Sequence, residues 1–171
     1  IALTAGIAGG ADVILIPEIP YSVDKIAAKI RAVKQSGRNF ALVIVSEAVK
    51  TPDGRKFEVV YHGGETRYGG IGEYLGGKIA EATGSETRVT VLGHVQRGAS
   101  PTCNDRLLAS ALGVKAVDLL KKGQFARMVA WQNMNVVDVP IELAIQECRT
   151  VDVEGMLVHT ARSLGISFGD Q

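Results

Sequence analysis

Cysteine, aromatic side chains and excess charge are all scarce in this sequence. Among 171 residues there are two cysteines, 5% aromatic residues, and 19 basic against 18 acidic side chains, for a formal net charge of +1. Two cysteines are too few for a secreted disulfide scaffold, so Cys103 and Cys148 are expected to be reduced thiols. A balanced charge without a basic stripe argues against nucleic acid or a membrane surface as a partner. No apolar run reaches the ~18 residues that a membrane span needs.

What the sequence does contain is glycine and aliphatic residues. Hydrophobic residues make up 46% and charged residues 22% of the chain, and 20 residues are glycine. This composition is that of a globular protein, and it excludes disorder and collagen-like repeats. Many glycines beside an aliphatic core are typical of α/β proteins, in which tight turns connect strands and helices.

Apolar runs and helical periodicity alternate along the chain. Continuous runs predict buried strands over residues 13–16, 40–45, 89–92 and 128–130. Apolar residues spaced three and four apart predict helices over residues 22–36, 71–83 and 102–122. The buried face of the last helix is expected to comprise Leu107, Ala111, Val114, Val117 and Leu120. The alternation predicts the fold class, which is α/β with a three-layer Rossmann-like parallel sheet and helices on both faces.

Two stretches fall outside this alternation. Residues 50–70 contain Pro52, Asp53-Gly54 and Gly63-Gly64, and an irregular excursion of this length is usually functional or part of an interface. The chain also opens without methionine, inside apparent secondary structure. We interpret this opening as that of an incomplete polypeptide, with processing as the alternative.

Candidate ligand-binding residues follow the apolar runs, because open α/β sheets bind ligands outside the carboxyl ends of their strands. Glu47 follows the second run, Arg88 and His94 flank the third, and Arg97 comes three residues after His94. Glu47 suits the role of an acceptor for ligand hydroxyls. An exposed loop residue or a helix cap is the structural alternative at this position.

The segment Gly93-His94-Val95-Gln96-Arg97-Gly98 has the strongest chemical character. Its glycines let the backbone turn sharply and approach a ligand, and the planar fork of Arg97 matches a phosphate. The structural alternative is a loop in which Arg97 pairs with a nearby acid such as Asp105. Spacing alone leaves both interpretations open.

Other motifs carry less information. Gly9-Gly10 and Gly69-Gly70-Ile71-Gly72 have the composition of an anion cradle, but without a Lys or Ser at a fixed offset simple turns are the favoured interpretation. The histidines at positions 62, 94 and 159 lack metal-ligand spacing, so no metal site is predicted. Both cysteines are expected to be buried as small hydrophobic residues.

A long stretch of the sequence resembles 6-phosphofructokinase, of the phosphofructokinase A family. It covers residues 86–101, with Leu92-Gly93-His94-Val95-Gln96-Arg97-Gly98 at its centre, and continues through Asp105-Arg106. The resemblance extends upstream through residues 8–12, 17–18 and 45–47. Residues 67–72 and 160–170 are similar to the branch that mixes ATP-dependent and pyrophosphate-dependent members.

The resemblance implies a glycolytic enzyme of the cytoplasm. Such an enzyme transfers a phosphoryl group, with Mg²⁺, from ATP or pyrophosphate to the 1-hydroxyl of fructose 6-phosphate. By resemblance, Glu47 would accept sugar hydroxyls, and His94 and Arg97 would hold the 6-phosphate. Arg88 would reach that phosphate from a neighbouring subunit, which implies a homo-oligomer, dimer or tetramer, with a shared active site.

The resemblance also shows what is missing from these residues. The family's glycine-rich donor loop, the segment with its catalytic Asp base and its Met-Gly-Arg segment are not found, so no catalytic residue is assigned and the chain alone is expected to be inactive. The chain therefore resembles the C-terminal portion of a two-domain subunit. Residues 1–95 would belong to an incomplete substrate domain, residues 96–150 to the donor domain, and residues 151–171 to a C-terminal return segment. The alternative is a noncatalytic sugar-phosphate-binding or regulatory subunit.

Two family positions are changed, and Ala99 stands where the family usually has a second glycine. Asp12 and Arg38 match acidic and basic ligands of an effector site in bacterial members, whereas Phe40 replaces an expected histidine. The resemblance therefore gives no firm expectation of control by ADP.

Overall fold

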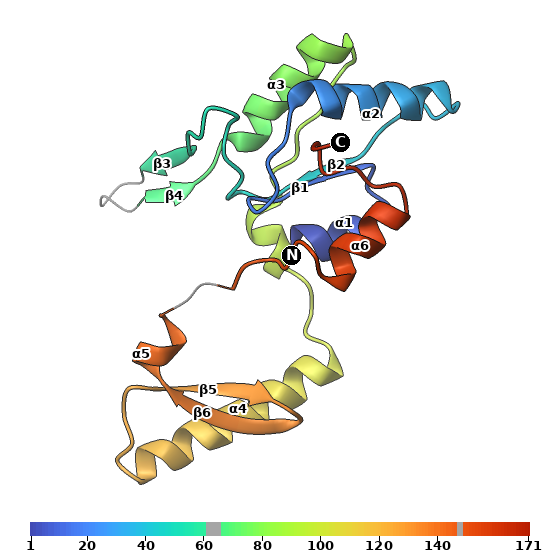
Figure 1. Cartoon of the computed structure of the whole chain (residues 1–171). Helices are drawn as coiled ribbons and strands as arrows, with labels where there is room; N and C mark the ends of the chain where they lie inside the picture. Colours follow the sequence, from blue (N-terminus) through green and yellow to red (C-terminus); the bar gives the residue numbers. More distant parts are fainter. Residues whose placement is uncertain (61–65, 147–148) are drawn as a thin grey trace. The chain divides into compact units, whose positions relative to one another are not determined.

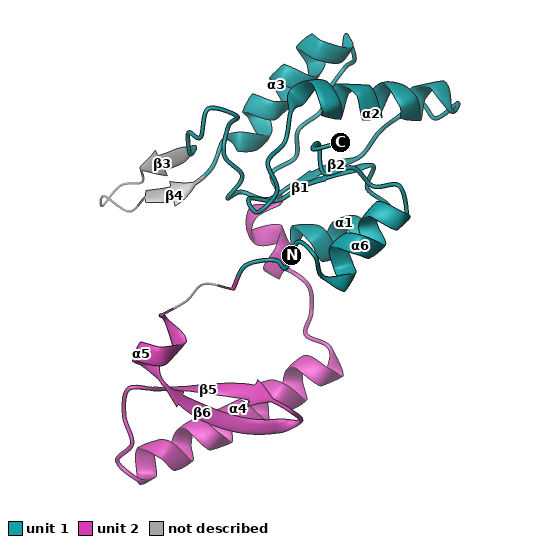
Figure 2. Ribbon diagram, in the orientation of Figure 1, with its two compact units in different colours: residues 1–91, 150–171 teal, residues 92–149 magenta. Residues whose placement is uncertain are grey.

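The computed structural model describes residues 1–60, 66–146 and 149–171, with the backbone alone for residues 58–60 and 66–68. His62 and Cys148 lie outside the described residues. The chain forms two compact units, shown in Figure 2. Unit 1 comprises residues 1–91 and 150–171, and unit 2 comprises residues 92–149.

Unit 1 is built on a parallel sheet (Figure 1). In chain order its elements are α1 (Ala2–Ala8), β1 (Val13–Leu15), α2 (Val23–Gln35), β2 (Val43–Val45), β3 (Glu58–Val60), β4 (Thr66–Tyr68), α3 (Ile71–Thr83) and α6 (Met156–Ser163). Strand β1 pairs in parallel with β2, from Val13 opposite Val43 to Leu15 opposite Val45. On its other side, Val13 forms a parallel bridge with Ser167, so the C-terminal segment lies beside β1 as a further extended segment.

Both faces of this sheet are covered by helices. Ile14 and Ile16 belong to a core cluster with residues of α1 and α6, whereas Val13 and Leu15 belong to a second cluster with residues of α2 and α3. Figure 1 shows the same two helix pairs on opposite sides of β1 and β2. The predicted fold class, α/β with a parallel sheet between helices, is confirmed.

The predicted helices agree closely with the structure. Helix α2 begins after Ser22, and Gly37 beyond its end has a φ of +92°. Helix α3 spans the predicted residues 71–83 and ends at Gly84, whose φ is +64°. Glycine adopts these left-handed conformations without the steric cost of a side chain, which explains why it ends both helices.

The strand predicted at residues 89–92 does not form in the described residues. Thr87 and Val89 instead pack on helix α3, where a Cβ added at Gly76 would lie 2.5 Å from Val89 Cγ2 and 3.6 Å from Thr87 Cγ2. Exposure alternates along residues 85–90, with Glu86, Arg88 and Thr90 facing solvent. The apolar run correctly indicated an extended segment. A strand also needs a neighbouring strand with which to form backbone hydrogen bonds.

The excursion at residues 50–70 is more regular than the sequence predicted. Strands β3 and β4 within it pair antiparallel, with Glu58 opposite Tyr68 and Val60 opposite Thr66. Before them, the hydroxyl of buried Thr51 accepts from the backbone N–H of Arg55 at 2.9 Å and closes a turn. The glycine and proline signals predicted an irregular segment and gave no sign of the short strands within it. Gly63 and Gly64 lie outside the described residues.

Unit 2 is a helix packed against an antiparallel hairpin. Its elements are η1 (Gly93–Arg97), α4 (Cys103–Lys121), β5 (Arg127–Gln132), β6 (Asn135–Pro140) and α5 (Ile141–Ala144). The strand predicted at residues 128–130 therefore exists, but it pairs antiparallel with β6 instead of joining a parallel sheet. A hairpin needs only the short turn at Asn133 and Met134, so the local partner is the one that pairs with it.

The predicted buried face of α4 is wrong. Leu107, Val114, Val117 and Leu120 are 69%, 64%, 49% and 57% exposed, whereas Leu119 is buried. Cys103, expected to be buried, is also exposed. The helix is apolar around most of its circumference, and the hairpin of unit 2 covers one side of it, so periodicity did not identify the covered side.

No helix in the described ranges is both long and apolar enough to span a membrane.

The contact between α3 and Val89 predicts that alanine substitutions at two adjacent glycines have opposite effects on stability. Gly76→Ala is expected to lower the free energy of unfolding by about 1–3 kcal/mol, because the new methyl group would overlap Val89. Gly77→Ala is expected to raise it by about 0.5–1 kcal/mol, because no atom lies within 4 Å and alanine favours the helix. Urea unfolding followed by circular dichroism measures both. Equal stabilisation by the two substitutions would contradict the packing of Val89.

Candidate functional site

The parallel strands of unit 1 end at one edge of the sheet, here called the carboxyl edge. Glu18 follows β1, Glu47 follows β2, and Asp170 follows the segment that pairs with β1. The residue Glu47 is exposed, and within the described ranges its carboxylate has no protein partner. It is therefore free to accept hydrogen bonds from a ligand.

His94 and Arg97 lie in η1 of unit 2, in a single 3₁₀ turn. Residues three apart in a 3₁₀-helix project from the same side, so the imidazole and the guanidinium share one side of η1. Gly93 begins the turn with a φ of +49°, and the N–H of Gly98 donates to the carbonyl of Val95 at 3.0 Å at its end. The two glycines thus shape the turn that presents both side chains.

The structural alternative for Arg97 is not observed. Asp105 caps helix α4, where its carboxylate accepts from the backbone N–H of Thr102 at 2.8 Å and from the Thr102 hydroxyl at 2.7 Å. These hydrogen bonds hold the pKa of Asp105 below its usual value. Across the described part of the chain, neither His94 nor Arg97 has a protein hydrogen-bond or ion-pair partner, and both are exposed. Their polar groups are available to a ligand.

Arg88 lies on the exposed side of residues 85–90 in unit 1. Its side chain is 87% exposed and pairs with Glu86, whose Oε1 lies 3.0 Å from both Nε and Nη2. Sequence reasoning identified Arg88 and missed Glu86. The signal was present, because residues two apart on an extended segment share one side.

The structure thus presents the four predicted residues in two pairs. Glu47 and Arg88 belong to unit 1, and His94 and Arg97 to unit 2. Each of the four is exposed. Their assignment to one binding site stays a prediction.

Asp170 at the carboxyl edge is held by an ion pair that sequence reasoning missed. Arg162 Nη2 lies 2.6 Å and Nη1 3.2 Å from its two carboxylate oxygens, and the guanidinium lies 4.9 Å from the ring centre of Phe168. Lys25 Nζ donates to the Asp170 backbone carbonyl at 2.5 Å. The hydrogen bonds from Arg162 are the main cause of a lowered Asp170 pKa. Together these contacts fasten the C-terminal segment to α2 and α6.

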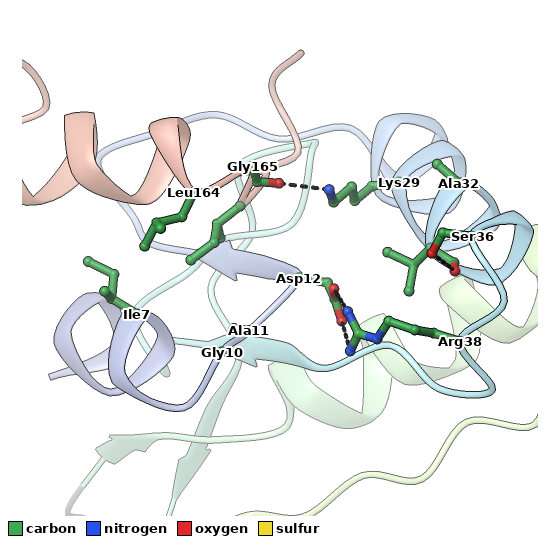
Figure 3. A pocket seen from close by; sticks show the side chains of 12 residues that line it. Ile7, Gly10, Ala11, Asp12, Lys29, Ala32, Ser36, Arg38, Leu164 and Gly165 are labelled. Atoms are coloured by element: carbon green, nitrogen blue, oxygen red, sulfur yellow. Dashed lines mark hydrogen bonds and ion pairs between the residues drawn. The ribbon is translucent and has the colours of Figure 1, made fainter.

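A cavity of about 510 Å³ lies in unit 1 near the amino end of β1 (Figure 3). Asp12 in its wall is 7% exposed and forms two hydrogen bonds with Arg38, at 2.6 and 3.2 Å. The Arg38 guanidinium lies 5.0 Å from the ring centre of Phe40, and Lys29 Nζ donates to the carbonyl of Gly165 at 2.7 Å. The charged groups of this cavity are therefore paired with one another or with the backbone.

A bound metal has no preformed site among these residues. Within the described ranges no three His, Cys, Asp or Glu side chains gather closely enough to hold an ion. Mg²⁺ is usually held by one or two carboxylates together with substrate phosphates and water, so the Mg²⁺ that the resemblance implies stays an expectation.

The fold is that of an α/β protein, and its exposed acidic and basic side chains are available to a ligand. The family model for phosphofructokinase matches residues 1–120. The chain belongs to the phosphofructokinase family.

Curated relatives extend the match to the whole chain. It is 56% identical over 170 residues to the ATP-dependent 6-phosphofructokinase 1 of Synechocystis sp., covering 99% of this chain and 47% of that protein. It is 44% identical over 171 residues to the ATP-dependent 6-phosphofructokinase of Chloroflexus aurantiacus, again with 47% of that protein covered. The chain thus spans about half the length of these relatives.

Solved structures show the same fold. The pyrophosphate-dependent phosphofructokinase of Marinobacter aquaeolei superposes with a TM-score of 0.66 at 20% identity, over 97% of this chain and 41% of that one. That of Nitrosospira multiformis gives 0.65 at 22% identity, over 91% and 40%. At these identities the likeness concerns the fold alone.

The Arg162–Asp170 ion pair predicts that the stability of the fold decreases at acidic pH. Because the folded pKa of Asp170 lies below its ordinary value of 3.8, the pair stabilises the fold above that value, and this contribution is lost as pH falls through the folded pKa. Asp170→Asn should therefore lower stability near neutral pH, and its deficit should shrink below about pH 4. Urea unfolding of both proteins at several pH values measures the difference, and a deficit independent of pH would refute the assignment.

Proposed function

We propose that this chain forms part of a 6-phosphofructokinase, which transfers a phosphoryl group to the 1-hydroxyl of fructose 6-phosphate. The observation that carries the proposal is the unpaired state of His94 and Arg97 on one side of η1, while Asp105 is engaged in capping α4. Exposed charged groups without protein partners suit the binding of a phosphate. The names of the relatives favour this enzyme over a noncatalytic sugar-phosphate-binding subunit.

Each predicted residue has a chemical role in this proposal. The forked guanidinium of Arg97 and the imidazole of His94 bind the 6-phosphate, since charge-assisted hydrogen bonds to phosphate are stronger than neutral ones. Glu47 accepts hydrogen bonds from hydroxyls of the sugar. Arg88 approaches the 6-phosphate of the substrate that is bound to a neighbouring subunit of a homo-oligomer. All four side chains bind and orient the acceptor.

Unit 2 forms no buried hydrophobic cluster among its described residues, which supports its assignment to a larger donor domain. Both hydrophobic clusters consist of residues from unit 1, and large apolar side chains are exposed on α4 and on the hairpin. These include Met128, Trp131 and Met134, which are 44%, 48% and 80% exposed. A unit this small with so much exposed apolar surface needs a partner to be stable. We assign that role to polypeptide that the longer relatives carry in addition.

The domain proposal follows from this assignment. Residues 1–95 contribute to a substrate domain, residues 96–150 to the donor domain, and residues 151–171 return to the substrate domain. The donor is ATP or pyrophosphate, used with Mg²⁺. We place the reaction in the cytoplasm.

Replacement of Arg97 tests the proposed phosphate contact in the complete subunit. Arg97→Ala should raise the KM for fructose 6-phosphate by about ten- to a hundredfold, as expected for the loss of roughly 1.5–3 kcal/mol from charged hydrogen bonds. Arg97→Lys should recover part of this loss, because an ammonium keeps the charge and lacks the fork. Steady-state kinetics with each substrate varied in turn provides the measurement.

The donor KM is the internal control for this experiment. It should stay near the wild-type value in both variants. An increase confined to the donor KM would place Arg97 at the donor and overturn its assignment.

The shared active site predicts complementation between two weak variants. An oligomer that mixes Arg88→Ala subunits with Glu47→Ala subunits should contain some sites that lack both residues and others that keep both. The intact sites should restore activity well above the mean of the two parents after dissociation and reassembly. Native mass spectrometry confirms that hybrids have formed. Hybrids with only the mean parental activity would show that Arg88 acts within its own subunit.

A further inference from the structure

Among the described residues, Glu86 is the partner of Arg88, and its carboxylate contacts one edge of the guanidinium. Its Oε1 lies 3.0 Å from Nε and 3.0 Å from Nη2, which together form the side edge of the group. The end of the fork, where Nη1 and Nη2 both point outward, has no protein partner in the portion of the chain that is described. That end has the geometry to donate two parallel hydrogen bonds to a phosphate.

The placement of this pair is set by the opposite side of the same segment. Thr87 and Val89 pack against the glycines of α3, where an added Cβ at Gly72 would lie 3.2 Å from Val89. Successive side chains of an extended segment alternate in direction, so anchoring Thr87 and Val89 turns Glu86 and Arg88 outward together. The exposed pair thus has a fixed register on a packed support.

We propose that Glu86 is a positioning residue for Arg88, which orients the free end of its guanidinium toward the phosphate of the substrate. This inference rests on the proposed function, in which Arg88 binds that phosphate. An unrestrained arginine loses rotamer freedom on binding, and a partner that already restricts the side chain reduces the loss. The side chains of Glu86 and Arg88 are 77% and 87% exposed, so the effect is that of a surface ion pair.

The test uses four variants of the complete subunit. Glu86→Ala should raise the KM for fructose 6-phosphate about two- to fivefold, the range of an exposed pair, with kcat and the donor KM unchanged. Glu86→Gln should restore part of the affinity, because its amide oxygen still accepts from Nε. Arg88→Ala should raise the KM about ten- to a hundredfold. Adding Glu86→Ala to Arg88→Ala should cause no further increase.

A matched control comes from another exposed ion pair of unit 1. Glu81 pairs with Lys78 at 2.8 Å on α3, with its side chain 70% exposed. Glu81→Ala removes a comparable surface carboxylate and should leave the KM unchanged. High salt should also reduce the effect of Glu86→Ala, since exposed charges are screened.

Each contrary outcome has a distinct meaning. A lower KM in Glu86→Ala would show that the carboxylate competes with or repels the phosphate, and would overturn the positioning role. An equal increase in the presence and absence of Arg88 would also overturn it, because Glu86 would then act independently. If Arg88→Ala alone leaves the KM unchanged, the proposed role of Arg88 fails, and the positioning role fails with it.

Discussion

The burial of strand β1 on both faces is the constraint on which unit 1 depends. Val13, Ile14, Leu15 and Ile16 are at most 3% exposed, and alternate members belong to the two separate core clusters. Full burial of such side chains stabilises the fold by about 1.5–3 kcal/mol each. Strand β2 and the segment at Ser167 both pair in parallel with β1. The direction of β1 therefore decides at which edge of the sheet the polar residues after them lie. Glu47 and Asp170 therefore reach the carboxyl edge through the packing of four apolar residues.

The two units differ in how completely they bury their apolar side chains. Unit 1 encloses both hydrophobic clusters, and ion pairs such as Arg162–Asp170 fasten its C-terminal segment in place. Unit 2 pairs its backbone hydrogen-bonding groups in a helix and a hairpin, yet it leaves many large apolar side chains exposed. Local hydrogen bonds can form these elements without burying these side chains. This contrast supports the proposal that unit 2 belongs to a larger donor domain.

The charged side chains also divide by their state of pairing. Asp12, Arg38 and Lys29 around the cavity of unit 1 are engaged with one another or with the backbone. Glu47, His94 and Arg97 are exposed and without protein partners in the described ranges. Arg88 is intermediate, because Glu86 occupies one edge of its guanidinium and leaves the other open. Free hydrogen-bonding capacity, more than charge alone, distinguishes the candidate substrate-binding residues from those that stabilise the fold.

The sequence by itself determined the elements whose signals are local. The apolar run at residues 13–16 indicated a strand buried on both faces, and terminal glycines such as Gly37 and Gly84 marked where helices end, because chain stereochemistry decides both. The resemblance around residues 92–98 likewise identified the family. Only the tertiary structure decided which partner each element has. It showed that Val89 packs on α3, that residues 127–132 pair within a hairpin, and that Asp105 caps α4 instead of binding Arg97. Such choices depend on contacts between distant or competing residues, which periodicity and composition do not encode.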